Sequence, residues 1–263
     1  MKKHNNYISK FIKYSVLILL IFSTTTTFAQ KRKKNKDAIK WISISAKGGV
    51  GNSILLNKDV ADEKNVSLDY LSLSYCYGGK LTFTYGESLG FGIEALSSKF
   101  GQKYDIKQDN FTYNKNLQLK SLDYVFFFRY SGEGGAYFEL GPKFTNLKSQ
   151  NLTNSIDDNF KAQDNLLDFY KKKYTSLMLG FGFSAIRTER FTMNMGLRGA
   201  YALGDLVNDH QQYILNDQVY IPQKTVNEAS TNPFSLQIML EFNYFFAFWG
   251  DASCGRGNLM FFK

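Results

Sequence analysis

The sequence has 263 residues, of which 44% are hydrophobic, 21% charged and 16% aromatic, with only three prolines. This composition excludes a disordered chain and a long coiled coil, and it favours a β-rich protein because Phe and Tyr suit pleated surfaces. Two histidines and two cysteines exclude most multi-ligand metal sites and any disulfide scaffold. The net charge of +9 comes from nine basic residues among the first 36, so the remainder is neutral and gives no reason to expect a nucleic-acid or nucleotide partner.

Residues 1–29 are predicted to form a signal peptide. Lys2, Lys3, Lys10 and Lys13 precede the apolar run 16–22, and Thr27-Phe28-Ala29 supplies small residues at the cleavage positions. An uncleaved anchor is disfavoured because the apolar run is shorter than the roughly 20 residues that a spanning helix needs. Residues 30–40 are predicted to be a basic periplasmic stub, in which contact with acidic headgroups or a periplasmic partner is the less favoured alternative to a leader without a binding role.

From residue 41 onward, apolar and polar side chains alternate with a period of two, which is typical of β-strands. In the clearest segment, Leu73 and Tyr75 share one face, whereas Ser74 and Cys76 share the other. The pattern predicts eight strands, at about 42–50, 69–85, 89–95, 121–130, 137–144, 176–184, 191–201 and 234–244.

The connections between these strands alternate in length. Short turns are predicted at 86–88, 131–135 and 188–190, and long polar loops at about 57–66, 105–116, 149–173 and 205–232. This arrangement is typical of an outer-membrane barrel with short periplasmic turns and long external loops. We therefore predict an all-β fold, an eight-stranded antiparallel transmembrane β-barrel over residues 41–246, in the outer membrane of a Gram-negative-type bacterium. Residues 247–263 are predicted to be a C-terminal periplasmic tail.

The two strand faces differ in chemistry, and this decides which one faces lipid. One face is rich in Phe, Tyr and Leu, while the other carries five cationic and four anionic side chains. Charges at mid-depth cost roughly 2–4 kcal/mol each when they face hydrocarbon, but they can pair inside a narrow lumen. We therefore expect the apolar face to contact outer-membrane lipid and predict a luminal charge network of Lys47, Lys80, Glu94, Asp123, Arg129, Glu139, Lys143, Arg198 and Glu241.

The sequence also resembles a known family, the PorT-like eight-stranded outer-membrane β-barrels. The resemblance spans roughly residues 41–246 and rests on the segments 77–81, 86–90, 122–124, 129–130 and 137–142. It implies the barrel fold and membrane lipid as surroundings. Because the family includes a component linked to protein secretion, it also implies a role in an envelope or secretion assembly by analogy.

Three motifs are candidates for chemistry. The run 47–53 resembles a phosphate-binding loop, but Asn52 replaces the signature lysine and no helix pattern follows, so it is interpreted as strand. Asp205, Asp209 and His210 lie in the last long loop, where a carboxylate beside a histidine is a candidate general base, although no nucleophile motif accompanies them. Cys76 and Cys254 are expected to be separate thiols, with a disulfide through a tail folded into the lumen as the alternative.

The predicted function is therefore that of a non-enzymatic outer-membrane barrel with a structural or interaction role. The alternatives are a rim-located enzyme that uses Asp209 and His210, and a narrow pore. No cofactor, catalytic residue or metal ligand is assigned. Pro142 lies within a predicted strand, where it cannot donate a ladder hydrogen bond, so we expect a bulge or a missing bond near Gly141-Pro142.

Overall fold

The structure is a computed structural model that describes residues 40–58, 66–69, 71–86, 88–108, 111–154, 170–207, 230–251 and 257–261. These residues belong to one compact unit, Ala38–Lys263. The predicted signal peptide 1–29 and all but the last residue of the predicted stub 30–40 lie outside the described residues. Within the described ranges, no helix is long and apolar enough to cross a membrane.

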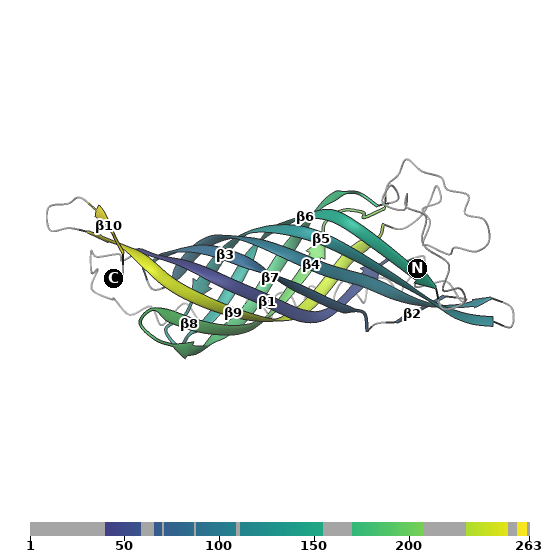
Figure 1. Ribbon diagram of the computed structural model, residues 1–263, viewed down its shortest axis with the longest axis horizontal. Coiled ribbons are helices and arrows are strands. Elements are labelled where there is room, and N and C mark those ends of the chain that lie inside the picture. Colours follow the sequence, from purple (N-terminus) through teal and green to yellow (C-terminus); the bar gives the residue numbers. More distant parts are fainter. Residues whose placement is uncertain are drawn as a thin grey trace, which may run out of the picture. The chain divides into compact units, whose positions relative to one another are not determined.

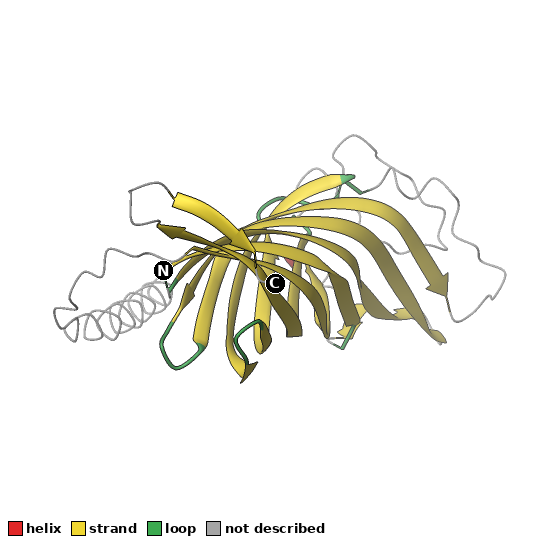
Figure 2. Cartoon of the chain, turned by 60° about the vertical axis from the view of Figure 1, so that its left-hand side comes forward, coloured by secondary structure: helices red, strands yellow, loops and turns green. Residues whose placement is uncertain are grey.

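Ten strands are described, and eight of them form a closed barrel (Figures 1 and 2). The strands are β1 (Lys40–Leu56), β2 (Val66–Asp69), β3 (Leu73–Tyr85), β4 (Leu89–Gln108), β5 (Phe111–Ser131), β6 (Ala136–Asn154), β7 (Lys173–Arg187), β8 (Phe191–Ala202), β9 (Asn232–Asp251) and β10 (Gly257–Phe261).

The barrel follows the chain in the order β1, β3, β4, β5, β6, β7, β8 and β9, and all neighbouring pairs are antiparallel. It closes where β1 pairs with β9 from Lys40↔Trp249 to Leu56↔Asn232. The predicted eight-stranded antiparallel barrel is confirmed.

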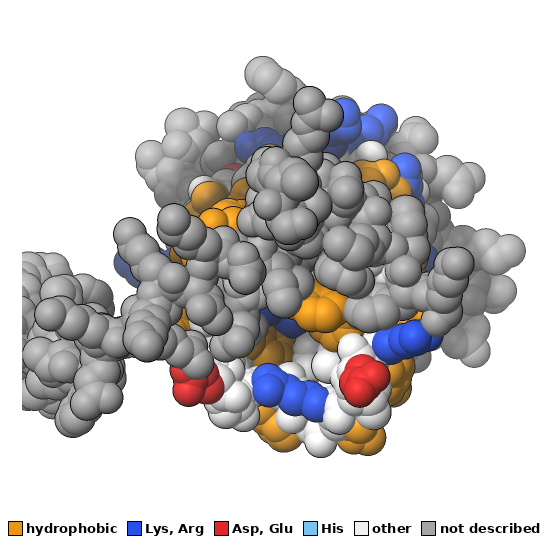
Figure 3. Space-filling view, turned by 90° about the vertical axis from the view of Figure 1, so that its left-hand side faces the viewer, with side chains coloured by type: hydrophobic (Ala, Val, Ile, Leu, Met, Phe, Trp, Pro, Cys, Tyr) orange, Lys and Arg blue, Asp and Glu red, His pale blue; other side chains and the backbone are white. Residues whose placement is uncertain are grey.

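The predicted short turns are also confirmed, and they lie together at one end of the barrel. Gly86 and Gly135 adopt positive φ angles of 61° and 87°, which L-residues with a side chain rarely adopt. At the third turn, the Thr188 amide donates to the Phe191 carbonyl at 2.8 Å. Seen from this end, described acidic and basic side chains lie next to one another at the rim (Figure 3).

Side-chain burial confirms the predicted faces. Along β3, Leu73 and Tyr77 are 71% and 60% exposed, whereas Ser74 and Cys76 are 0% and 5% exposed. Large apolar side chains are exposed in the same alternating way on β4 to β9, among them Phe91, Phe126 and Phe181. Because these chains point away from the lumen, they form the surface that contacts hydrocarbon.

Two details of the long connections differ from the prediction. The loop expected over about 105–116 is wrong, because β4 and β5 stay paired as far as Gln108↔Phe111. The predicted strand 69–85 is divided, since β3 begins at Leu73 and β2 forms a separate pairing with β4. The extended ends of β4 and β5 carry polar side chains on their outer faces. The apolar alternation that identified the other strands is therefore missing from them.

The segment predicted as a C-terminal tail contains further β-structure. β9 continues to Asp251, and β10 pairs with it from Gly257↔Asp251 to Phe261↔Ala247. The last pair between β8 and β9 is Phe191↔Tyr244, so β10 follows β8 along the same edge of β9. The assignment of this segment to the periplasm stays a prediction.

Pro142 interrupts the ladder as expected. On β7 it is paired with Leu177, but the β5–β6 register passes from Val125↔Lys143 to Phe128↔Leu140 without intervening pairs. The backbones approach closely here, because a Cβ atom on Gly141 would lie 1.9 Å from the Phe126 carbonyl oxygen. The missing pairing lies where the sequence predicted it.

Replacing Gly141 with alanine should therefore destabilise the barrel by about 1–3 kcal/mol, since the added methyl group meets backbone that cannot move aside cheaply. Chemical unfolding in lipid vesicles measures this loss. Gly199→Ala is the matched control, because a Cβ atom there would find its nearest neighbours at 3.9 and 4.0 Å. Equal stability of the two variants would contradict the close approach of β5 and β6.

Candidate functional site

A cluster of seven charged side chains fills part of the lumen. Each comes from a different strand and each lies on the inward face: Lys47 on β1, Lys80 on β3, Glu94 on β4, Arg129 on β5, Glu139 on β6, Arg198 on β8 and Glu241 on β9. At this level β7 contributes Gly180, where a Cβ atom would lie 3.3 Å from Glu139 Oε2. The missing side chain leaves room for the carboxylate.

Glu139 is the most connected member of this luminal network. Its carboxylate lies 2.5 Å from Arg129 Nη2, 2.6 Å from Arg198 Nη2, 3.3 Å from Lys47 Nζ and 3.6 Å from Lys80 Nζ. All four cationic side chains of the network therefore converge on one acid.

The other two acids connect the same cations around the lumen. Glu94 accepts from Lys47 at 2.9 Å and from Arg198 at 2.5 Å. Glu241 lies 2.8 Å from Lys80 Nζ, 2.9 Å from Arg129 Nη2 and 3.1 Å from Lys47 Nζ. Arg129–Glu241 and Arg198–Glu94 join strands that are not neighbours in the barrel, so these ion pairs cross the lumen, whereas Lys47–Glu241 follows its wall.

Burial makes these ion pairs mutually dependent. The seven side chains are between 0% and 10% exposed, so each would be strongly penalised without its partners. Four cations face three carboxylates, which leaves one excess positive charge. Two aromatic rings lie beside the cations: Lys80 Nζ is 4.9 Å from the Phe127 ring centre and the Arg129 guanidinium 4.1 Å from that of Tyr137.

Asp123 and Lys143 form a second, separate pair. Lys143 Nζ lies 3.2 Å from Asp123, which also accepts hydrogen bonds from Ser98 at 2.7 Å and Ser121 at 3.0 Å. The predicted set of nine charges is thus divided by the structure into a network of seven and a pair.

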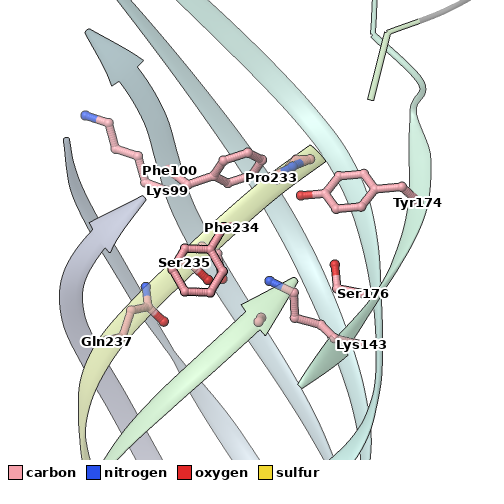
Figure 4. A pocket seen from close by; sticks show the side chains of 11 residues that line it. Lys99, Phe100, Lys143, Tyr174, Ser176, Pro233, Phe234, Ser235 and Gln237 are labelled. Carbon is pink, nitrogen blue, oxygen red and sulfur yellow. The ribbon is translucent and has the colours of Figure 1, made fainter. Parts of the chain in front are cut away.

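A small cavity of about 30 Å³ lies beside this pair (Figure 4). Lys143, Tyr174 and Ser176 line one side of it, and Phe100 and Pro233 lie across from them. The volume is about that of one water molecule, which is too small for an organic ligand.

Apolar side chains pack within the lumen next to the charges. A buried cluster beside them has members that are at most 5% exposed: Cys76, Leu96, Val125, Phe127, Met178 and Met239. The sequence did not predict the roles of Phe127 and Tyr137, which are aromatic residues on the otherwise polar inward face. Asn194 was missed too, although its amide donates to Glu241 at 3.0 Å.

The three glutamates lie close enough for a metal site, since one oxygen from each falls within 4.8 Å of the others. Every one of these carboxylates already binds ammonium or guanidinium groups of Lys47, Lys80, Arg129 or Arg198. A divalent cation would have to displace these groups, so we interpret the three glutamates as structural residues and not as metal ligands.

The remaining sequence candidates have different outcomes. Residues 47–53 lie within β1, which confirms that they are strand. Asp205 accepts backbone hydrogen bonds from Val207 at 3.1 Å and Thr231 at 2.9 Å, which ties the two ends of its loop together. Asp209 and His210 lie outside the described residues.

The two cysteines of the sequence are Cys76 and Cys254. Cys76 is buried, and its thiol lies 3.4 Å from Gln237 Oε1. Cys76 is a free cysteine, as expected for separate thiols, and Cys254 lies outside the described residues.

Comparison with solved structures gives barrels of low sequence identity. The chain is similar to the surface protein NspA of Neisseria (10% identity, 76% of this chain, 95% of that chain, TM-score 0.35). It is also similar to the N-terminal barrel domain of OprF from Pseudomonas aeruginosa (13% identity, 77% and 97%, TM-score 0.29). A third similar structure is the outer membrane protease OmpT of Escherichia coli (11% identity, 83% and 99%, TM-score 0.25).

No curated protein matches the sequence. A protein family does match: the family described as outer membrane protein beta-barrel domain aligns with residues 28–208, which is more than half of the chain. The closed ring of eight antiparallel strands and its apolar outer face agree with that match. The protein is thus located in the outer membrane of a Gram-negative bacterium, and the chain belongs to the outer membrane protein beta-barrel domain family.

Proposed function

We propose that this barrel is a non-enzymatic protein with a structural or interaction role, acting as a subunit of an envelope assembly. The filled lumen is the observation that carries the proposal. Charged side chains from seven strands form ion pairs with one another, and apolar side chains pack beside them. An eight-stranded barrel has an interior just wide enough for such side chains.

The same feature argues against a pore. An ion that crossed the lumen would have to pass Arg129 and Arg198, which are both bonded to Glu139. Separating these groups would leave buried charges without partners. We therefore expect no stable conductance when the protein is reconstituted in planar bilayers, and a steady open channel would contradict the filled lumen.

The geometry also gives little support to catalysis. Among the described residues, the buried carboxylates of the network are engaged by Lys and Arg, and Asp205 binds backbone amides. Chemistry at the rim would rest on Asp209 and His210. The resemblance to PorT-like barrels favours a secretion assembly among the envelope assemblies open to this protein.

Affinity purification after mild cross-linking in the native outer membrane tests the proposal. We expect an envelope protein to be recovered in stoichiometric amount with the full chain and not with an unrelated eight-stranded barrel from the same membrane. Recovery of the chain alone would count against an assembly role. A cellular defect reproduced by both Asp209→Asn and His210→Ala, with recovery of the partner unchanged, would favour the rim enzyme instead.

A further inference from the structure

A row of lysines crosses the outer face of four neighbouring strands. Lys99 on β4 is the direct cross-strand partner of Lys120 on β5. The β5–β6 register passes from Lys120↔Ser149 to Ser121↔Leu147, so Lys148 is the extra residue of a bulge beside Lys120. Lys173 on β7 is paired with Asn146, two residues before Lys148. Lys103 lies on the same face of β4, at the next outward position but one beyond Lys99. We call these five residues the lysine row.

The lysine row borders the apolar surface at the end opposite the short turns. On β4 the outward side chains Phe91, Ile93 and Ala95 come first, and Lys99 follows at the next outward position but one. On β5 the outward Tyr124 and Leu122 likewise precede Lys120 in the direction away from the turns. Since short turns of such barrels are periplasmic, the row lies at the height of the outer leaflet headgroups.

Four of the five lysines have no described carboxylate opposite them, and Lys103 is the exception, because Asp69 on β2 is its cross-strand partner. No described carboxylate forms an ion pair with any of the five lysines, whereas Lys143 in the lumen has Asp123 within 3.2 Å. Like charges placed directly opposite each other across two strands are destabilising. The Lys99–Lys120 pair therefore favours an anion from outside the described chain.

A groove on the outer surface adjoins the lysine row. It has a volume of about 90 Å³ and is lined by both Lys99 and Lys103, with Leu73 and Tyr75 on its apolar side. It forms where β3 begins at Leu73 while β4 continues to Gln108. An occupant of this groove meets positive charge and exposed apolar side chains together.

We propose that the lysine row binds the phosphate groups of a phosphorylated glycolipid of the outer leaflet. A lipid phosphate is an anion that lies beside hydrocarbon at this height, and its acyl chains would lie against Leu73, Tyr75 and the apolar surface below. Lysine stems suit this boundary because they cover apolar surface while the ammonium group reaches the headgroup region. A soluble polyanion would match the charges of the groove but not its apolar side.

The test uses the full chain in phosphatidylcholine nanodiscs that contain a small fraction of bisphosphorylated lipid A, with bound lipid counted by native mass spectrometry. Each basic residue near a charged headgroup contributes about a factor of five to ten in affinity. The variant Lys99→Ala/Lys120→Ala/Lys148→Ala should therefore lose about 100-fold in affinity, and the corresponding triple arginine variant should retain binding. The control variant Lys58→Ala/Lys171→Ala/Lys172→Ala removes the same charge outside the row and should bind normally.

Two further ligands test whether binding requires both the phosphate groups and the acyl chains. Lipid A without phosphates should bind no better to the wild type than to the alanine variant, and equal binding of phosphorylated and dephosphorylated lipid would overturn the proposal. The soluble phosphorylated headgroup without acyl chains should bind far more weakly. If it binds as tightly as the lipid, the lysine row is a site for a soluble polyanion and the proposal is wrong. Unchanged heat-modifiability on gels shows that each variant is folded.

Discussion

Glu139→Gln is expected to lower the free energy of unfolding by about 3–5 kcal/mol, because it removes one side of several buried ion pairs at once. Glu139 lies within 3.6 Å of all four cations of the luminal network. Without its charge, Lys47, Lys80, Arg129 and Arg198 face only Glu94 and Glu241. The substitution keeps the size of the side chain, so the loss reports charge and not a cavity.

Urea unfolding in lipid vesicles and the midpoint of heat-modifiability on gels measure this effect. Arg129→Met is the informative comparison and should cost less, because it leaves three cations against three acids and each carboxylate keeps another partner. Glu189→Gln, in an exposed turn, is the control and should change stability by less than about 0.5 kcal/mol. If Glu139→Gln behaves like this control, the network does not stabilise the barrel.

Ile93→Arg is expected to cost about 2–4 kcal/mol because it places a charge in hydrocarbon. Ile93 is 48% exposed on the outer face of β4, within the apolar run from Leu89 to Ala95. Its cross-strand partners, Leu81 and Phe126, are outward-facing too. The one acidic residue of this run, Glu94, points into the lumen, so the guanidinium would have no partner on the outer face.

Leu73→Arg is the matched control, since Leu73 is also outward-facing but begins β3 at the end opposite the short turns. Depth dependence predicts a cost of about 0–1 kcal/mol near the interface. Unfolding in vesicles, followed by tryptophan fluorescence, compares the two variants. Similar costs at both positions would show that the outer face of β4 does not lie at mid-depth.

The barrel was predictable because its pattern is repeated and strict. Alternation along β3, where Tyr75 and Tyr77 point out and Ser74 and Cys76 point in, fixes the face of every side chain once the strand is recognised. The nine luminal charges followed from the same argument, since a charge on the lipid face is too costly. All nine are luminal in the structure, and each is ion-paired there with other members of the set.

Other features depend on contacts that alternation does not encode. The division into a network of seven and the Asp123–Lys143 pair depends on the stagger between strands, which sets how far apart in height the inward residues lie. The β4–β5 extension escaped prediction because beyond the membrane its outer face carries Lys103 and Asp105 in place of apolar side chains. The role of Asn194 depends on the pairing of β8 with β9, which places it opposite Glu241.

The closing seam between β1 and β9 gives the luminal network a consequence for biogenesis. Lys47 and Glu241 are direct register partners across this seam, and their side chains lie 3.1 Å apart. A slip of one residue would turn Lys47 towards the acyl chains and separate it from all three glutamates. Because the first and last strands of the barrel must meet in this register before the charges are compensated, an unclosed or misaligned sheet retains unpaired charges that oppose its insertion. We therefore expect the membrane to disfavour a wrongly closed barrel, because its unpaired charges would face hydrocarbon.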